Sequence, residues 1–298
     1  MSGNDAATLS VSKRYKKQSA LGEIWHRLKR NKGAVMGLVI FFIFVIIALY
    51  SSFFVDYNTQ VTAIDPSNAY KPPSSEHFFG TDNMGRDLFY RVLYGTRYSL
   101  VIGLFSVGFA LVVGIILGSI AGFYGGRTED IIMRASDILA SIPGLLLGMC
   151  IVTVLGTNLF NLVFAVGVHS IPEFIRVTRG SVLLVRNQEF VESATAIGYG
   201  SLKTLFTQVV PNGLSPIIVT YTCRIGSAII EAASLSFLGF GVPVPTPEWG
   251  ALISDGRNYL RMAPFLTYFP GIFIMIAVLA FNILGDGLRD ALDPKLKR

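Results

Sequence analysis

Residues 33–55 read GAVMGLVIFFIFVIIALYSSFFV and contain no charged side chain. As an α-helix this stretch would be about 35 Å long, and the hydrocarbon core of a bilayer is about 30 Å thick. The run is too long for the apolar part of a signal peptide, and no small-residue cleavage site follows it. We therefore expect a retained membrane-spanning helix, which places the chain among membrane proteins.

The composition of the whole chain agrees with this assignment. Of its 298 residues, 52% are hydrophobic and 15% are charged, whereas about 25% are charged in a typical soluble domain. The formal net charge is +6, but the basic residues lie between apolar stretches and not on one folded domain, so nucleic-acid binding is not indicated. The two cysteines and three histidines show no disulfide or metal-binding spacing, and we expect no cofactor and no metal.

Further apolar stretches predict five more spans, at 98–124, 138–155, 159–175, 214–240 and 268–284. Six spans place both chain ends on one side of the membrane. The segments on that side carry 18 Lys and Arg residues, and those on the other side carry six, so the positive-inside rule assigns both termini to the cytoplasm. The fold class is an all-α polytopic membrane protein, with an external loop at 56–97, a five-span core at 98–298 and a cytoplasmic loop at about 176–213.

Residues 1–32 form a basic cytoplasmic tail in this arrangement. Leu21, Ile24, Trp25 and Leu28 fall on one helical face, and basic residues surround them. The pattern predicts an amphipathic helix in the plane of the interface, with the tryptophan at headgroup depth. The alternative is a solvated basic segment.

The chain shows no means of hydrolysing ATP. A P-loop requires a lysine directly after a glycine, and no lysine in this chain follows a glycine. We therefore expect no catalytic residue, and any ATP would be hydrolysed by a partner.

Arg224 and Glu231 are charged residues within the span predicted at 214–240. Each would cost about 2.5–3.5 kcal/mol at a lipid-facing helix centre, so both should face protein or water. They share a helical face, but at two turns' separation we expect them to be too far apart for a direct pair. They either line a pathway or contact a partner helix, or they form structural ion pairs with another span.

Four glycines recur at every fourth position in the second predicted span: Gly114, Gly118, Gly122 and Gly126. Such a ridge without side chains allows another helix to approach closely. We expect this packing to occur within the chain and not between subunits.

The cytoplasmic loop contains two amphipathic stretches. Phe190, Val191, Ala194 and Ile197 follow helical spacing, and Gly198 is placed to end that helix. The second stretch, at 202–210, precedes Pro211, which can begin the next helix. A helix-turn-helix in such a loop has no role inside the bilayer, so we interpret it as a docking element for a soluble partner. The alternative is a loop that folds on itself.

At this loop the sequence resembles a known family. Glu192-Ser193-Ala194, followed by Gly198 and Pro211, is similar to the EAA motif of bacterial ABC importer permeases. The segments 80–87, 234–250 and 282–294 resemble the dipeptide/oligopeptide permeases of that family, C-type subunit. Ile171 departs from the tryptophan found in many relatives. Just after the first segment, Arg91 follows Asp87 by four residues, a spacing that favours an ion pair on a helix.

The resemblance implies a six-helix type I importer permease in the inner membrane of a bacterium, translocating peptides. It implies a heterodimer with a homologous B-type permease, two ATP-binding-cassette ATPase subunits and an extracytoplasmic peptide-binding protein. In that family the loop forms a coupling helix that enters a groove on the ATPase. The positions carried over are Phe190, Val191, Glu192, Ala194, Ile197, Gly198 and Pro211.

Other functions remain open at this point. A nickel chelate or another small solute is an alternative cargo for the same machinery. An ion-coupled secondary transporter or channel predicts uptake that follows an ion gradient without an ATPase, and a membrane scaffold predicts no flux.

Overall fold

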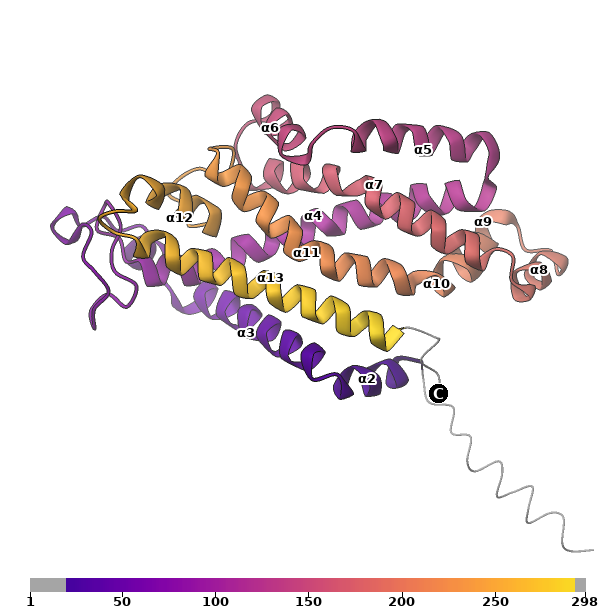
Figure 1. Cartoon of the computed structure of the whole chain (residues 1–298), viewed down its shortest axis with the longest axis horizontal. Helices are drawn as coiled ribbons and strands as arrows, with labels where there is room; N and C mark the ends of the chain where they lie inside the picture. Colours follow the sequence, from indigo (N-terminus) through magenta and orange to yellow (C-terminus); the bar gives the residue numbers. More distant parts are fainter. Residues whose placement is uncertain (1–19, 293–298) are drawn as a thin grey trace, which may run out of the picture.

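The computed structural model describes residues 20–292, except for the side chains of residues 20, 21, 23 and 24. Within these residues the chain is helical and contains no β-strand (Figure 1). The expected all-α class is confirmed.

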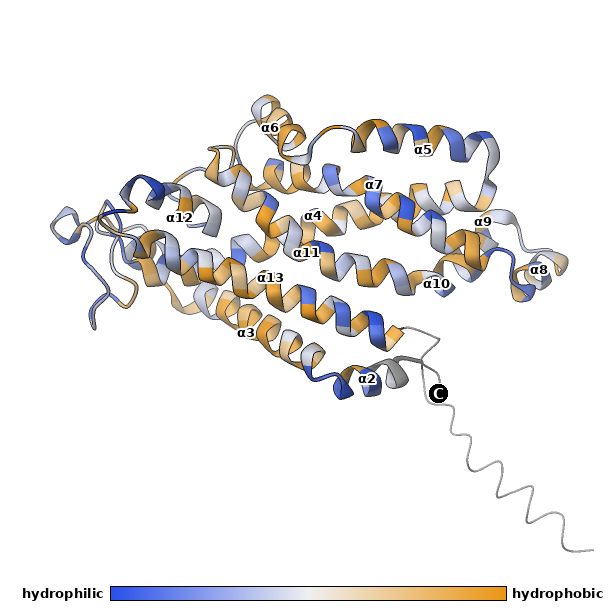
Figure 2. Cartoon of the chain, in the orientation of Figure 1, coloured by the Kyte–Doolittle hydropathy of each residue, from blue (hydrophilic) through white to orange (hydrophobic). Residues whose placement is uncertain are grey.

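Five helices are long and apolar enough to cross a membrane. They are α3 (Lys32–Phe54), α4 (Leu88–Tyr124), α7 (Leu159–Val185), α11 (Leu214–Phe237) and α13 (Phe265–Leu292). Hydrophobic residues predominate along them, whereas the connecting segments at both ends of the bundle are more hydrophilic (Figure 2).

Three of these helices are longer than the sequence predicted. Helix α4 begins at Leu88 and not at 98, because the Asp87 carboxylate accepts a hydrogen bond from the Phe89 amide (2.9 Å) and caps the helix. Helix α7 continues to Val185, past the predicted end at 175, and α13 continues to Leu292. The segment between α3 and α4 therefore ends at Asp87, and the segment between α7 and α11 starts at 186, because these helices extend beyond their apolar cores.

The span predicted at 138–155 is broken. It consists of the end of α5 (Gly126–Ala140) and all of α6 (Gly144–Leu155), which meet at an angle of 87°. Pro143 lies at the break, since proline lacks an amide donor and disfavours helical geometry at the residue before it. With 12 residues, α6 is only about 18 Å long and does not cross a bilayer by itself.

Short elements occupy the two ends of the bundle (Figure 1). One end carries the loop before α4, with η1 (Tyr57–Val61) and η2 (Pro66–Asn68), together with α12 (Trp249–Gly256) and η4 (Arg257–Tyr259). The opposite end carries α8 (Glu189–Ala196), α9 (Ser201–Thr204), η3 (Leu205–Val209) and α10 (Val210–Asn212). Helix α2 (Ala20–Arg30) and the end of α13 lie toward that same end.

Helix α2 packs on the C-terminal part of α13. Leu28 is buried against Ala34 and Ala291. The side-chain oxygen of Asn31 caps α3, and its side-chain Nδ2 donates a hydrogen bond to Asp290 (3.0 Å). Trp25 is half exposed. The predicted interfacial helix thus has a helical backbone, although the side chains of Leu21 and Ile24 lie outside the described residues.

Candidate functional site

The loop between α7 and α11, which was predicted to be cytoplasmic and to dock a partner, forms a compact unit with one buried face and one exposed face. On α8, Val191 and Ala194 are buried, and Val191 packs with Leu205 and Val209 of η3. On the other side, Phe190 is 42% exposed and Ile197 is 74% exposed. Helix α8 projects beyond the end of the bundle (Figure 1), so this apolar surface has no partner within the described part of the chain.

Gly198 ends α8 with a backbone that other residues rarely adopt. Its φ is +92°, and the next amide, that of Tyr199, donates to the Ala194 carbonyl (3.1 Å). This pattern is typical of a helix terminator that requires glycine. Glu192 is exposed on α8, and Pro211 lies in the short helix α10.

The loop is joined firmly to the spans. The Ser181 hydroxyl on α7 donates to the Gly213 carbonyl at the start of α11 (2.6 Å). Arg186, at the end of α7, donates to the Gly122 carbonyl at the end of α4 (2.7 Å). Arg179 of α7 pairs with Glu129 of α5. These contacts fix the ends of α7, α11, α4 and α5 to one another where the loop begins and ends.

Three of the four predicted ridge glycines contact α7. A Cβ atom added to Gly114, Gly118 or Gly122 would overlap atoms of α7, so the two backbones are in close contact there. The prediction for Gly126 was wrong: α4 ends at Tyr124, and Gly126 begins α5 with φ +55° and no atom within 4 Å of an added Cβ. The turn at 125–126 interrupts the ridge.

Arg224 and Glu231 lie in direct contact, which corrects the expectation that two turns would separate them. Arg224 Nη2 is 3.6 Å from Glu231 Oε2. The long arginine side chain spans the distance that the backbone positions leave. Arg224 Nε also lies 3.4 Å from Glu173 Oε2 and 3.3 Å from the Ser170 hydroxyl, both on α7. The cluster therefore joins two spans.

A second charged cluster lies at the opposite end, where the loop before α4 meets α12. Arg91 is 1% exposed, and its guanidinium lies between Asp82 (3.6 Å) and Asp255 (3.8 Å). Asp82 also pairs with Arg86 (2.6 Å). The predicted Asp87–Arg91 pair was wrong, because Asp87 caps α4 and pairs with His77 (2.8 Å).

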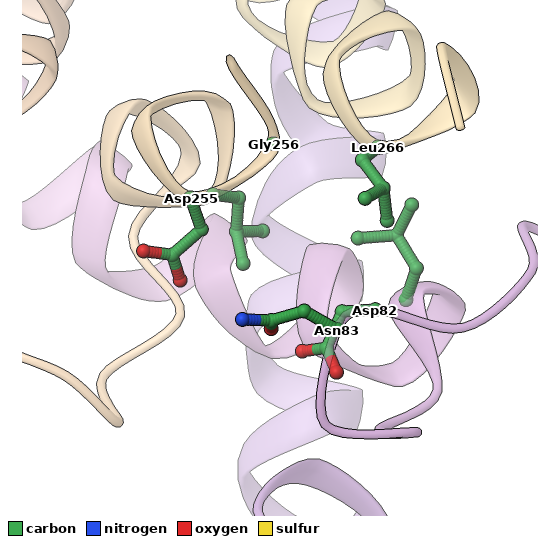
Figure 3. A pocket seen from close by; sticks show the side chains of 7 residues that line it. Asp82, Asn83, Asp255, Gly256 and Leu266 are labelled. Carbon is green, nitrogen blue, oxygen red and sulfur yellow. The ribbon is translucent and has the colours of Figure 1, made fainter. Parts of the chain in front are cut away.

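This second cluster borders a small hollow (Figure 3). Asp82, Asn83 and Asp255 form its polar side, and leucines from α4, α12 and α13 form the other. Burial raises the pKa of the Asp255 carboxyl, and the neighbouring Arg91 partly offsets that increase. The ionic contacts connect the loop, α4 and α12 at this end of the molecule.

The sequence did not identify Glu173 or Asp255 as functional candidates. Glu173 follows Pro172 within a predicted span, which was a usable signal because a carboxylate in a membrane helix is rare. No local pattern identified Asp255, since its partner Arg91 is far away in the sequence.

Comparisons with known proteins place this architecture in a family. Residues 114–298 match the family described as binding-protein-dependent transport system inner membrane component, and residues 19–73 match the N-terminal TM domain of oligopeptide transport permease C. The chain is 44% identical to the dipeptide transport system permease protein DppC of Alkalihalophilus pseudofirmus, across 92% of this chain and 90% of the relative.

Other relatives have similar identities. The chain is 42% identical to the glutathione transport system permease protein GsiD of Pectobacterium atrosepticum, across 98% of this chain and 96% of the relative. It is 42% identical to the di/tripeptide transport system permease protein DppC of Pseudomonas aeruginosa, across 94% and 93% respectively. A solved structure of the MetNI methionine ABC transporter in an inward-facing conformation has the same fold, with a TM-score of 0.57 at 16% identity, covering 69% of this chain and 98% of that one.

These relatives are permease proteins, so the chain is a transport subunit of the inner membrane and not an ATPase. Its apolar helices agree with a multi-pass membrane protein. The chain belongs to the binding-protein-dependent transport system inner membrane component family of ABC importer permeases.

Proposed function

We propose that this chain translocates short peptides across the membrane, driven by ATP hydrolysis in separate subunits. Its partners would be a homologous B-type permease, two ATP-binding-cassette ATPases and an extracytoplasmic peptide-binding protein. Both termini and α8 would face the cytoplasm, with α2 in the plane of the interface.

The exposed face of α8 carries this proposal. Phe190 and Ile197 present apolar surface on and just after α8, and within the described residues nothing covers it. Burial of apolar side chains is the main favourable term in protein association, and aromatic residues are enriched at the centres of interfaces. A groove on an ATPase subunit would supply the missing contacts.

The internal contacts of the loop support its role as a lever. Val191 packs against η3, and the Ser181–Gly213 hydrogen bond joins α7 to α11. When the ATPases close, α8 would move as a rigid body with these helices. The spans would then switch between inward-facing and outward-facing arrangements.

The peptide cargo is supported by the relatives. The names of three of them specify dipeptides, glutathione and di/tripeptides, at 42–44% identity over almost the whole chain. All three cargoes are short peptides.

The proposal is tested by removing the exposed apolar surface of α8. The variant Phe190→Ala/Ile197→Ala should fold, because both side chains point away from the buried face, but it should retain less ATPase during purification of the complex. Loss of about 100 Å² of buried apolar area would cost about 2.5 kcal/mol, which weakens docking by roughly 70-fold.

The matched control is Val154→Ala on α6, where a side chain that is 83% exposed lies far from the loop. We expect that variant to co-purify with normal ATPase content and to support ATP-dependent peptide uptake. Peptide uptake that persists after removal of the ATPase subunits, or normal docking of the double variant, would contradict the proposal.

A further inference from the structure

A row of polar side chains runs along one face of the apolar helix α11. The residues recur at alternating intervals of four and three positions, and none is buried: Thr220, Arg224, Ser227, Glu231 and Ser234. This polar stripe lies opposite a buried apolar face that includes Ile225 and Ile229. Lipid cannot solvate the charged residues of this stripe, Arg224 and Glu231, so that part of the face must border water or protein.

The stripe carries an uneven charge. Arg224 is one cation shared between two carboxylates, Glu231 of the stripe and Glu173 of α7, which gives the three groups a formal net charge of −1. Its distances of 3.4 Å and 3.6 Å to them exceed those of a tight charge-assisted hydrogen bond, which are about 2.7–2.9 Å. Within the described residues, Glu231 Oε1 has no hydrogen-bond partner.

Glu173 is the group that opens outward. Its side chain is 48% exposed, although it lies near the middle of α7. A half-exposed carboxylate within a membrane helix requires water or a polar partner beside it. Hydrophilic turns interrupt the apolar surface of both α7 and α11 (Figure 2).

The break in the α5–α6 span contacts the same region. Gly144, the first residue of α6, packs so closely on the imidazole of His169 that an added Cβ would lie 2.5–2.7 Å from three ring atoms. His169 lies one turn before Glu173 on α7. A broken helix at membrane depth is tolerated where it is buried in protein or lines a water-filled cavity, and this break lies beside ionisable groups.

We propose that the polar stripe of α11 and Glu173 line the translocation pathway, and that their net negative charge favours cationic over anionic peptides. This inference rests on the proposed peptide function. A cationic peptide is attracted to the excess carboxylate and an anionic one is repelled. Arg224 limits the excess of negative charge to one, so that a cationic peptide is not bound too tightly to leave the pathway.

The test compares two dipeptides in one preparation of the complete transporter, reconstituted with its partner subunits in vesicles. The measured quantity is the ratio of the uptake rates of Ala-Lys and Ala-Glu, which is independent of the amount of active protein. Glu173→Gln should lower this ratio about five- to tenfold, because it removes one charge that acts with opposite sign on the two cargoes. Arg224→Gln should raise the ratio by a similar factor.

Two controls separate charge from structure. Asp137→Asn also replaces a carboxylate by an amide, but its partner Arg176 lies on the exposed α5–α7 surface, so the ratio should stay at its normal value. Arg224→Lys keeps the charge and should also leave the ratio unchanged. If Arg224→Gln fails to assemble, the effect of Glu173→Gln on the ratio decides the question by itself.

An unchanged ratio in Glu173→Gln, with normal rates for both dipeptides, would overturn the inference. An unchanged ratio with reduced assembly would also overturn it, since the cluster would then be a subunit contact. If the unmodified transporter moves neither dipeptide nor any other short peptide, the proposed function itself fails. That result is distinct from uptake that does not depend on the charge of the cargo.

Discussion

Replacement of Gly198 by alanine tests whether the end of α8 must have its observed backbone conformation. The residue has φ +92°, and no atom lies within 4 Å of an added Cβ. The expected effect of Gly198→Ala is therefore backbone strain. A clash of the added methyl group with neighbouring atoms is not expected. A residue with a side chain loses roughly 1–2 kcal/mol in the left-handed region. This would shift the population away from the docking conformation by a factor of about 5–30.

Gly200 provides a matched control two residues further along the chain. It also has open space around an added Cβ, but its φ of −67° suits any residue. Gly200→Ala should therefore behave like the unmodified protein, or gain slightly in stability because alanine restricts the unfolded chain. The two variants differ only in the backbone conformation that they must adopt.

The assay is ATP hydrolysis stimulated by peptide-loaded binding protein, measured together with peptide uptake in vesicles of equal permease content. Gly198→Ala should reduce both rates severalfold, and the ATPase should dissociate more readily during purification. Gly200→Ala should leave them unchanged. Equal rates for the two variants would show that the conformation at Gly198 is not needed for coupling.

Two further predictions concern stability. Gly114→Ala should lower the unfolding free energy of the purified protein by about 1–3 kcal/mol, because the added methyl group overlaps Phe174. Gly108→Ala, on an open face of the same helix, should raise that free energy by about 0.5–1 kcal/mol. Similar values for the two variants would refute the close contact. Burial raises the pKa of Asp255 above its ordinary value of 3.8. The contribution of Asp255 to the unfolding free energy is therefore greatest below pH 3.8 and is lost as the pH rises through the raised pKa. Unfolding measured across this pH range should show that dependence in the unmodified chain and not in Asp255→Asn.

The prediction of the spans illustrates what local sequence can show. Residues 33–55 coincide with α3 to within one residue at each end, because a continuous apolar stretch specifies a lipid-facing helix without reference to the rest of the chain. Helices α4 and α7 were predicted too short. The polar start of α4 at Leu88 and the polar end of α7 at Val185 are helical because of caps and contacts with other elements. Hydropathy does not detect these contributions.

The candidate sites show the same division. The helix of the docking loop followed from the spacing of Phe190, Val191, Ala194 and Ile197, since 3.6 residues per turn places such residues on neighbouring faces. That spacing did not show which of them would be buried. The structure places Val191 and Ala194 inward because η3 packs on that side, and it leaves Phe190 and Ile197 exposed.

By itself, the sequence determined that the chain is an all-helical membrane protein with an amphipathic helical loop between two spans and no P-loop, since apolar length, helical spacing and short motifs are local properties. Only the tertiary structure showed that Arg224 contacts both Glu231 and Glu173, that one span is bent by 87°, and that Arg91 joins Asp82 to Asp255. The physical reason is that these contacts join residues on different helices or on different turns of one helix. Where side chains meet across helices depends on crossing geometry and on the length of an arginine side chain, and neither is encoded in a window of neighbouring residues.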